Sequence, residues 1–261
     1  MQLSWRRINL PRRDEHMRSP AAALDIFDHI DKVEARFKTE EPRVMAFLPE
    51  QDRFERLRRE AESLLARFPQ PGQVPPLFGV LLGANDMFHI TGFPTRGGSR
   101  LPPEELQGVQ AESVSCLQAA GALVLGKTVT TEFAYFAPGP TRNPHNLEYT
   151  LGGSSSGSAA AVAAGLCDLA LGTQTIGSII RPAAYCGVIG WKPSYDRISK
   201  AGVIPLSPSL DHVGFFAPDV ATAKRVAPVL YKDWRHGRIG LHSEPVLGIP
   251  EGPYLKNASD Y

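Results

Sequence analysis

The sequence predicts an α/β protein with a helical N-terminal region. Three observations predict this class: two amphipathic helical patterns near the N-terminus, short apolar runs between glycine-rich turns, and alanine-rich segments between those runs. The 261 residues carry 28 Lys and Arg against 27 Asp and Glu, a net charge of +1. This balance argues against a broad nucleic-acid-binding or acidic-membrane surface. No apolar run approaches the length of about 18 residues that a membrane span requires.

The N-terminal part, residues 1–68, is expected to be an arm and two helices that pack on the core. Basic and acidic residues mix in residues 1–20, which favours a solvated arm. Apolar residues recur at helical spacing over Ala21–Lys38 and again over Gln51–Arg67. Prolines then break the chain before the core, residues 69–261, and the two parts are expected to form a single domain.

Strands and helices alternate in this core. The runs that read as strands are Leu77–Leu82, Ala122–Leu125 and Leu169–Thr173. The segments that read as helices are Gln107–Ala120 and Gly157–Leu166. This alternation is typical of an α/β domain.

The three cysteines are Cys116, Cys167 and Cys186, an odd number without the spacing of metal ligands. Each stands among apolar residues, which favours buried reduced thiols. We therefore expect a cytoplasmic protein without a metal site.

Gly121–Thr128 matches the phosphate-loop pattern G-x-x-x-x-G-K-[ST]. A phosphate loop must stand between a strand and a helix so that its backbone N–H groups can surround phosphate. Here the four middle residues are Ala-Leu-Val-Leu, and β-branched residues follow where a helix should begin. We therefore interpret the segment as a strand that ends in a turn.

Gly153–Gly157 matches the nucleophile elbow G-x-S-x-G, with Ser155 as its serine. The elbow of an esterase follows an apolar strand, whereas Asn146–Gly153 reads as a loop. A later Asp and His would also be required. Asp211 with His236 is the pair that the sequence offers.

Two Ser/Gly-rich loops form a larger signal. The first begins at Gly152, and the second surrounds Ser178, with an alanine-rich helix and a short strand between them. This connection would bring the two loop tips together. Successive backbone N–H groups in the second loop, Thr175–Ser178, suit a developing oxyanion.

The passage from Gly152 to Gly187 resembles the amidase signature family, whose members hydrolyse linear amides with a Ser–cis-Ser–Lys triad. Other segments carry the same resemblance from about Pro75 to the C-terminus: Phe93–Ser99, Gly126–Ala134, Pro140–Pro144, Gly190–Pro193 and Ser209–Gly214. The resemblance implies the amidase-signature fold, a mixed β-sheet flanked by helices. It also implies that no metal or organic cofactor is needed. Family members are longer, so the chain is expected to be C-terminally truncated and its sheet incomplete at the C-terminus.

The resemblance assigns a role to each site residue. Ser178 is the acyl-enzyme nucleophile, and Ser154 is the serine that follows a cis peptide bond. The oxyanion hole consists of Thr175, Ile176, Gly177 and Ser178. Arg181 matches the position that binds a substrate carboxylate in malonamidase-like members, the subgroup that Gln174 and Thr175 also resemble. A structural ion pair is the alternative for Arg181.

One departure from the family pattern concerns the catalytic base. Gly79–Asp86 matches the segment that carries the family's lysine, and Asn85 stands at the lysine position. Lys127 matches a different, non-catalytic position of the family. An asparagine amide can form hydrogen bonds but does not accept a proton near pH 7. Loss of a general base typically slows a reaction by about 10²–10⁴-fold.

Three hypotheses follow for function. The first is an amidohydrolase that hydrolyses a small linear amide through Ser178, with activity much reduced by Asn85. The second is a catalytically silent amidase-like scaffold or binding protein, and the third is an elbow-type esterase that uses Ser155. The expected partner is a small-molecule amide rather than nucleic acid or membrane, and a homodimer is a further expectation.

Overall fold

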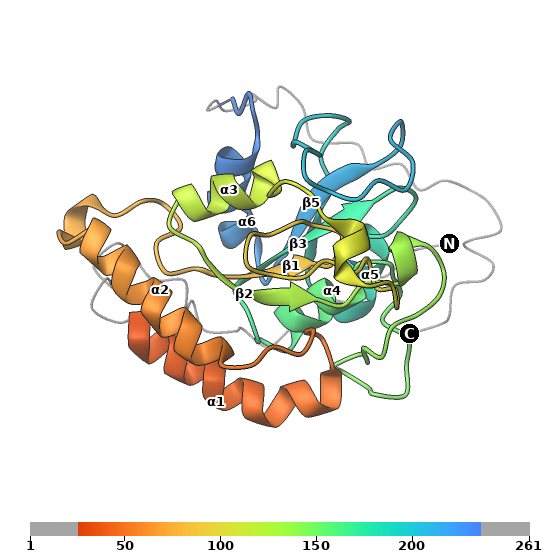
Figure 1. The fold of residues 1–261 in the computed structure, drawn as a ribbon, viewed down its shortest axis with the longest axis horizontal. Coiled ribbons are helices and arrows are strands. Elements are labelled where there is room, and N and C mark those ends of the chain that lie inside the picture. Colours follow the sequence, from red (N-terminus) through yellow and green to blue (C-terminus); the bar gives the residue numbers. More distant parts are fainter. Residues whose placement is uncertain (1–25, 236–261) are drawn as a thin grey trace, which may run out of the picture.

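The computed structural model describes residues 26–235, and they form a five-stranded mixed sheet flanked by helices. The strand order is β2-β1-β3-β5-β4 (Figure 1). Strands β2, β1 and β3 run parallel, whereas β5 is antiparallel to both β3 and β4. The predicted fold class, a mixed sheet flanked by helices, is therefore confirmed.

The elements follow one another in a simple order along the chain. The strands are β1 (Leu81–Asn85), β2 (Leu123–Thr128), β3 (Leu169–Gln174), β4 (Ile189–Trp191) and β5 (His212–Ala217). The α-helices are α1 (Ile26–Val44), α2 (Arg53–Arg67), α3 (Glu112–Ala119), α4 (Ser156–Ala163), α5 (Ile180–Cys186) and α6 (Val220–Leu230). Short 3-10 turns are η2 (Pro71–Gln73), η3 (Pro103–Leu106) and η4 (Glu132–Ala134).

The sequence located most of these elements but misplaced several ends. The predicted strand Leu77–Leu82 is wrong over its first part, because β1 begins at Leu81. The predicted helix Gln107–Ala120 begins only at Glu112. The first helix continues to Val44, beyond its predicted end. The predicted N-terminal arm lies outside the described residues.

The helices cover the two faces of the sheet in separate groups (Figure 1). Leu81 on one face packs in a buried cluster with Ile30 of α1, Leu57 of α2 and Ala160 of α4. The next residue, Leu82, points to the opposite face and joins a second cluster that includes residues of α3 and α6. Because successive side chains of a strand point to opposite faces, the sheet has one hydrophobic core on each face. The assignment of residues 1–68 as a region distinct from the core stays a prediction.

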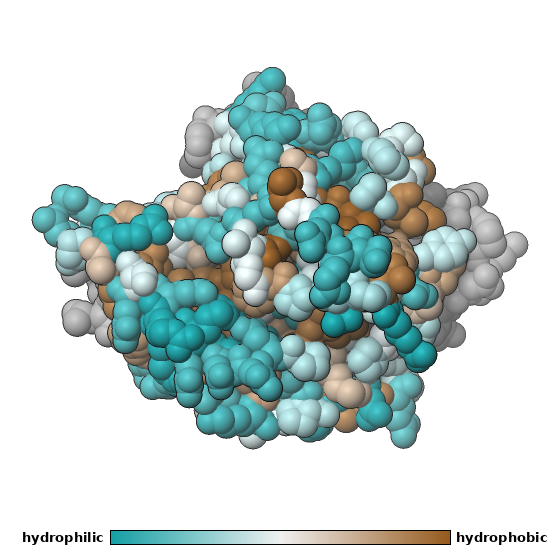
Figure 2. All heavy atoms as spheres, viewed as in Figure 1, coloured by the Kyte–Doolittle hydropathy of each residue, from teal (hydrophilic) through white to brown (hydrophobic). Residues whose placement is uncertain are grey.

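The outer surface of the N-terminal helices is strongly polar. Figure 2 shows hydrophilic residues over the exposed side of α1 and α2. Ion pairs between the two helices lie there, including the pair of Arg58 with Asp31 at 2.6 Å. No helix in the described residues is long and apolar enough to cross a membrane.

Helix α4 lies unusually close to the neighbouring backbone. Every residue from Ser156 to Ala163 is buried, and four of the eight are alanines. A methyl group on Gly157 would lie 2.3 Å from the carbonyl oxygen of Ala46 and 2.4 Å from the backbone nitrogen of Val129. The small side chains of α4 therefore allow this close packing.

This contact predicts a specific sensitivity. Gly157→Ala is expected to lower the free energy of unfolding by about 2–3 kcal/mol, since the added methyl group meets backbone atoms that cannot move aside easily. Gly72→Ala is the matched control, because a methyl group there meets no atom within 4 Å. Denaturant unfolding of both variants measures the difference. Equal stabilities of the two variants would contradict the packing of α4.

Candidate active site

Two Ser/Gly-rich loops meet at the carboxyl end of β3. The first loop leads into α4, and the second joins β3 to α5. The backbone N–H of Ser155 in the first loop donates to the carbonyl oxygen of Ser178 in the second at 3.3 Å. The predicted meeting of the two loop tips is therefore confirmed.

Ser154 follows a cis peptide bond, Gly153–Ser154, which is the geometry that the family resemblance implies. Its carbonyl oxygen accepts the backbone N–H of Thr131 at 3.0 Å and the hydroxyl of Thr130 at 3.3 Å. Its own hydroxyl oxygen is buried without a hydrogen-bond partner among the described residues. A buried polar atom without a partner is unusual, and such atoms occur at catalytic sites.

The second loop, Thr175–Ser178, carries free backbone donors. Within the described part of the chain, no acceptor receives the N–H groups of Ile176, Gly177 or Ser178. The Ile176 side chain is 82% exposed, whereas Ser178 is only 8% exposed. Free N–H groups beside a nearly buried serine are suited to stabilising an oxyanion.

Gln174, the last residue of β3, holds the shape of this loop. Its side-chain oxygen accepts the backbone N–H groups of Ile179 at 2.8 Å and Ile180 at 2.9 Å. Its side-chain nitrogen donates to the carbonyl oxygen of Ile176 at 3.2 Å. The buried Gln174 amide thus forms three hydrogen bonds, one to the Ile176 carbonyl and two to N–H groups at the start of α5. The sequence analysis did not predict this role.

Asn85 ends β1 on the face of the sheet that α4 covers. It pairs in register with Thr128, whose hydroxyl bonds to that of Ser158 in α4 at 2.7 Å. Asn85 is fully buried, and its side-chain oxygen accepts the backbone N–H of Met87 at 3.1 Å. Its side-chain nitrogen has no partner among the described residues. The position resembling that of the family's lysine therefore lies at the same sheet edge as Ser154, with a side chain that is not a base.

Arg181 contacts the cis peptide rather than an acidic residue. Its Nε and Nη2 atoms donate to the carbonyl oxygen of Gly153 at 3.2 Å and 2.9 Å. It forms no ion pair with a carboxylate among the described residues. Within residues 26–235 its contact is thus a pair of hydrogen bonds to one backbone carbonyl oxygen, and the choice between a carboxylate-binding role and a structural ion pair stays a prediction.

Lys127 is engaged elsewhere. Its ammonium nitrogen lies 2.9 Å from a carboxylate oxygen of Asp86, and both side chains are almost completely buried. It also donates to the hydroxyl of Thr95 at 3.0 Å. Burial lowers the pKa of Lys127 from its ordinary value, and the negative charge of Asp86 offsets part of this. Because Lys127 lies inside β2, the segment is a strand, as predicted, and not a phosphate loop.

Ser155 does not have the environment of an elbow nucleophile. Its hydroxyl is fully buried, donates to the carbonyl oxygen of Thr173 at 3.1 Å and accepts the Thr173 N–H at 3.2 Å. The segment before it, residues 146–153, forms no strand. Asp211 bonds to backbone and to Thr175, and His236 lies outside the described residues. Ser155 therefore lacks the accessible, free hydroxyl that the esterase hypothesis requires.

The cysteines show no sign of reactivity. All three are free. Cys167 and Cys186 are buried as expected, whereas Cys116 is only partly buried, because it lies on the half-exposed side of α3. Burial raises the pKa of Cys186 to about 12 and that of Cys167 further, so both thiols stay protonated at neutral pH. No group of three or more His, Cys, Asp or Glu side chains in residues 26–235 is placed to hold a metal ion.

The mixed sheet and the paired serine loops are those of an amidase-type fold. A sequence model of the Amidase family matches residues 35–244. The chain therefore belongs to the Amidase family, whose members act on carbon–nitrogen bonds. Its assignment to the malonamidase-like subgroup stays a prediction.

Relatives and solved structures agree with this membership. A glutamyl-tRNA(Gln) amidotransferase subunit from Salinibacter ruber is 40% identical over 72% of the chain and 41% of the relative. Its counterpart from Sulfurisphaera tokodaii is 36% identical over 90% of the chain and 49% of the relative. The native peptide amidase from Stenotrophomonas maltophilia is 33% identical, with a TM-score of 0.72 over 82% of the chain and 46% of that structure.

Another similar structure is described as a vestigial protein complex that reveals the evolutionary origins of an s-triazine catabolic enzyme. It is 36% identical, with a TM-score of 0.73 over 81% of the chain and 48% of that structure. The chain thus spans about half of the length of the proteins that it matches, or less.

The buried ion pair below the site yields a testable prediction. Lys127→Met is expected to lower the free energy of unfolding by about 3–5 kcal/mol, because it leaves the Asp86 carboxylate buried without its counter-charge. Lys224→Met is the control, since Lys224 is exposed on α6 and such surface changes stay within about 0.5 kcal/mol. Thermal or denaturant unfolding measures both. A Lys127→Met loss as small as that of the control would show that the pair adds little.

Proposed function

We propose that this chain supplies the serine nucleophile of an amidohydrolase that acts on a small linear amide. The observation that supports this most is the contact between the two serine loops: Ser178 stands beside free N–H groups, and the loop of Ser154 bonds directly to it. This arrangement suits attack on a carbonyl carbon whose oxygen becomes negatively charged.

The reaction would proceed in two balanced halves. The Ser178 oxygen attacks the amide carbonyl, and the N–H groups of Ile176, Gly177 and Ser178 stabilise the oxyanion. The proton of Ser178 passes to Ser154, and Ser154 passes its own proton to the leaving nitrogen. The carbon–nitrogen bond then breaks, and a neutral amine leaves. Water attacks the acyl-enzyme by the reverse proton route, releasing the acid and restoring Ser178.

Asn85 limits this relay. A lysine at this position would take a proton from Ser154 and return it to the leaving group. The Asn85 amide does not accept a proton near neutral pH. The free donors of the oxyanion loop remain, so slow acylation of Ser178 is expected. Oxyanion holes alone can leave about 10³–10⁴-fold catalysis over water.

A second candidate function follows from the same residue. With Asn85 in place of the base, the chain could serve as a catalytically silent amidase-like scaffold that binds amides without hydrolysing them. The Asn85 side-chain nitrogen, which has no hydrogen-bond partner within residues 26–235, favours this alternative. Its N–H groups can donate to a bound amide, but the amide is not a base.

We also infer the setting of the protein. Its partner would be a small-molecule amide, and its buried reduced cysteines fit the cytoplasm. Two curated relatives are named as one component of an amidotransferase, so assembly with another chain, or as a homodimer, is part of the proposal.

The central test restores the base. Asn85→Lys is expected to raise the turnover of small amides by about 10²–10⁴-fold, since the relay then has a proton acceptor. Turnover of acetamide, malonamate and benzamide by the full-length chain measures this. A folded Asn85→Lys protein with parental turnover would favour the silent scaffold.

Two controls sharpen this test. Asn85→Met matches the lysine in length but has no base, so it should not raise turnover. Ser178→Ala in the Asn85→Lys background should abolish the gain. Mass mapping after treatment with a fluorophosphonate should find the label on Ser178, and a label elsewhere would contradict the assignment of the nucleophile.

Arg181 gives a separate prediction about substrate class. If its guanidinium binds a substrate carboxylate, Arg181→Met in the Asn85→Lys background should raise KM for malonamate about tenfold or more and leave KM for acetamide unchanged. If it acts only by holding the Gly153 carbonyl, kcat should fall for both substrates. Steady-state kinetics separate these outcomes, and Arg181→Lys tests whether the bidentate fork matters. Unchanged kinetics for both substrates would exclude both roles.

A further inference from the structure

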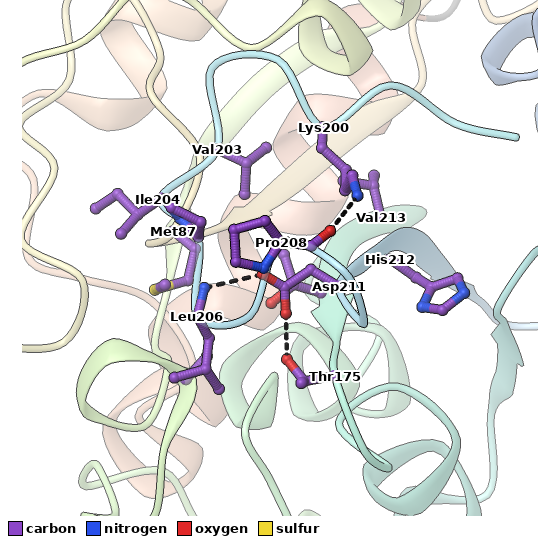
Figure 3. A pocket seen from close by; sticks show the side chains of 13 residues that line it. Met87, Thr175, Lys200, Val203, Ile204, Leu206, Pro208, Asp211, His212 and Val213 are labelled. Atoms are coloured by element: carbon purple, nitrogen blue, oxygen red, sulfur yellow. Dashed lines mark hydrogen bonds between the residues drawn. The ribbon is translucent and has the colours of Figure 1, made fainter. Parts of the chain in front are cut away.

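A small pocket lies beside the oxyanion loop, on the face of the sheet opposite to α4. Its inner wall is formed by Thr173 of β3, Thr175 and Met87, which follows β1. Its outer wall is the segment between residues 200 and 213 (Figure 3). The pocket has a volume of about 100 Å³. A single water needs only about 10–15 Å³ of such space, so the pocket has room for a short alkyl group.

Strand β3 separates this pocket from α4 and Ser155. Gly172 faces α4, since a methyl group on it would lie 2.8 Å from the hydroxyl oxygen of Ser155. Thr173, the next residue, therefore points to the other face. Thr175 follows at the sheet edge, where the two sides meet. The pocket thus opens beside the site without sharing its serines.

The lining of the pocket is mainly apolar. The residues that give it this character are Met87, Ala134, Val203, Ile204, Pro205, Leu206, Pro208 and Val213. Such a surface favours an apolar group, and each buried methylene strengthens binding about fourfold.

The charged side chains of the pocket are already satisfied. Asp211 accepts the hydroxyl of Thr175 at 2.5 Å and the backbone N–H groups of Leu206 and Ser207 at 2.9 Å and 2.8 Å. Lys200 donates to the carbonyl oxygen of Pro208 at 2.7 Å and to the hydroxyl of Tyr195 at 3.0 Å. These bonds hold the two charged side chains to the pocket's own wall. The apolar lining disfavours a carboxylate or an ammonium, because removing a charge from water without a buried partner is costly.

Asp211 also connects the pocket to the candidate active site. Its carboxylate joins Leu206 in the pocket wall to Thr175, the first residue of the oxyanion loop (Figure 3). Ser178 follows Thr175 by three residues, a span of at most about 10 Å. Through Thr175 the pocket therefore lies within about 10 Å of the backbone of Ser178.

We propose that this pocket binds a short, neutral apolar group carried by the amide substrate. The inference rests on the proposed function for the identity of the ligand as an amide. The pocket is then a specificity site, and Asp211 is a positioning residue that holds its wall against the oxyanion loop.

Binding of a homologous series tests the proposal without requiring turnover. Dissociation constants of acetamide, propanamide, butanamide and pentanamide are measured by ligand-observed NMR with the full-length chain. We expect about fourfold tighter binding per methylene until the pocket is full, and then no further gain. Butylamine and butanoate should bind more weakly than butanamide. Affinity that does not depend on chain length would overturn the proposal.

Variants of Val203 assign the effect to this pocket. Val203→Trp should remove the gain with chain length, and Val203→Ala should extend it by one or two carbons. Val220→Trp is the control, because Val220 is exposed on α6 and does not line the pocket. Should Val203→Trp fail to fold, Val203→Ala still decides the matter. A chain-length dependence that neither substitution alters would also overturn the proposal.

Two further measurements separate related outcomes. Comparing alkanamides with N-alkylacetamides shows whether the acyl or the amine side of the amide enters the pocket, as only the correct series should respond to Val203→Ala. Labelling of Ser178 by a fluorophosphonate in Asn85→Lys reports on the hydrolase function independently. Labelled Ser178 with a flat affinity series overturns the pocket alone. Graded affinity without labelling overturns the hydrolase function alone.

Discussion

The candidate site depends on the close approach of α4 to the ends of β2 and β3. The backbone N–H of Gly157 donates directly to the carbonyl oxygen of Val129 at 2.9 Å, which a larger residue would prevent. On the other side, Gly172 leaves room for Ser155. Because both surfaces lack bulk, the first serine loop can reach the second. The small residues Gly157 and Gly172 thus allow the contact between the two serine loops.

Much of the fold could be predicted because hydrophobic periodicity is a local signal. The misplaced ends of β1 and α3 result from contacts between residues that are far apart in the sequence. The residues before β1 form a turn instead of a strand, because Leu77 and Gly79 donate to the carbonyl oxygens of Ala120 and Gly121 after α3. Likewise α3 begins late because Ala111 donates to the carbonyl oxygen of His89. Hydrophobic periodicity, which depends on neighbouring residues, does not indicate such hydrogen-bond partners.

The site was less predictable than the fold. Motif resemblance located the two loops, and the cis bond before Ser154 agrees with it. The contacts that shape the loops could not be anticipated in the same way. Gln174 bonds to three backbone groups whose positions exist only once the loop is folded, and Arg181 meets the Gly153 carbonyl from a segment 28 residues away. The sequence indicated the candidate site residues, but not their hydrogen-bond partners.

Asn85 has an evolutionary consequence. The codons of asparagine and lysine differ only in their third base, so a single point mutation separates this side chain from the family's lysine. The contacts that hold the two serine loops together involve other residues, namely Ser155, Gln174 and Arg181. The contact between the two serine loops therefore does not require a lysine at position 85. A lineage carrying this chain could lose or regain the proton acceptor in one mutational step while the rest of the site persists.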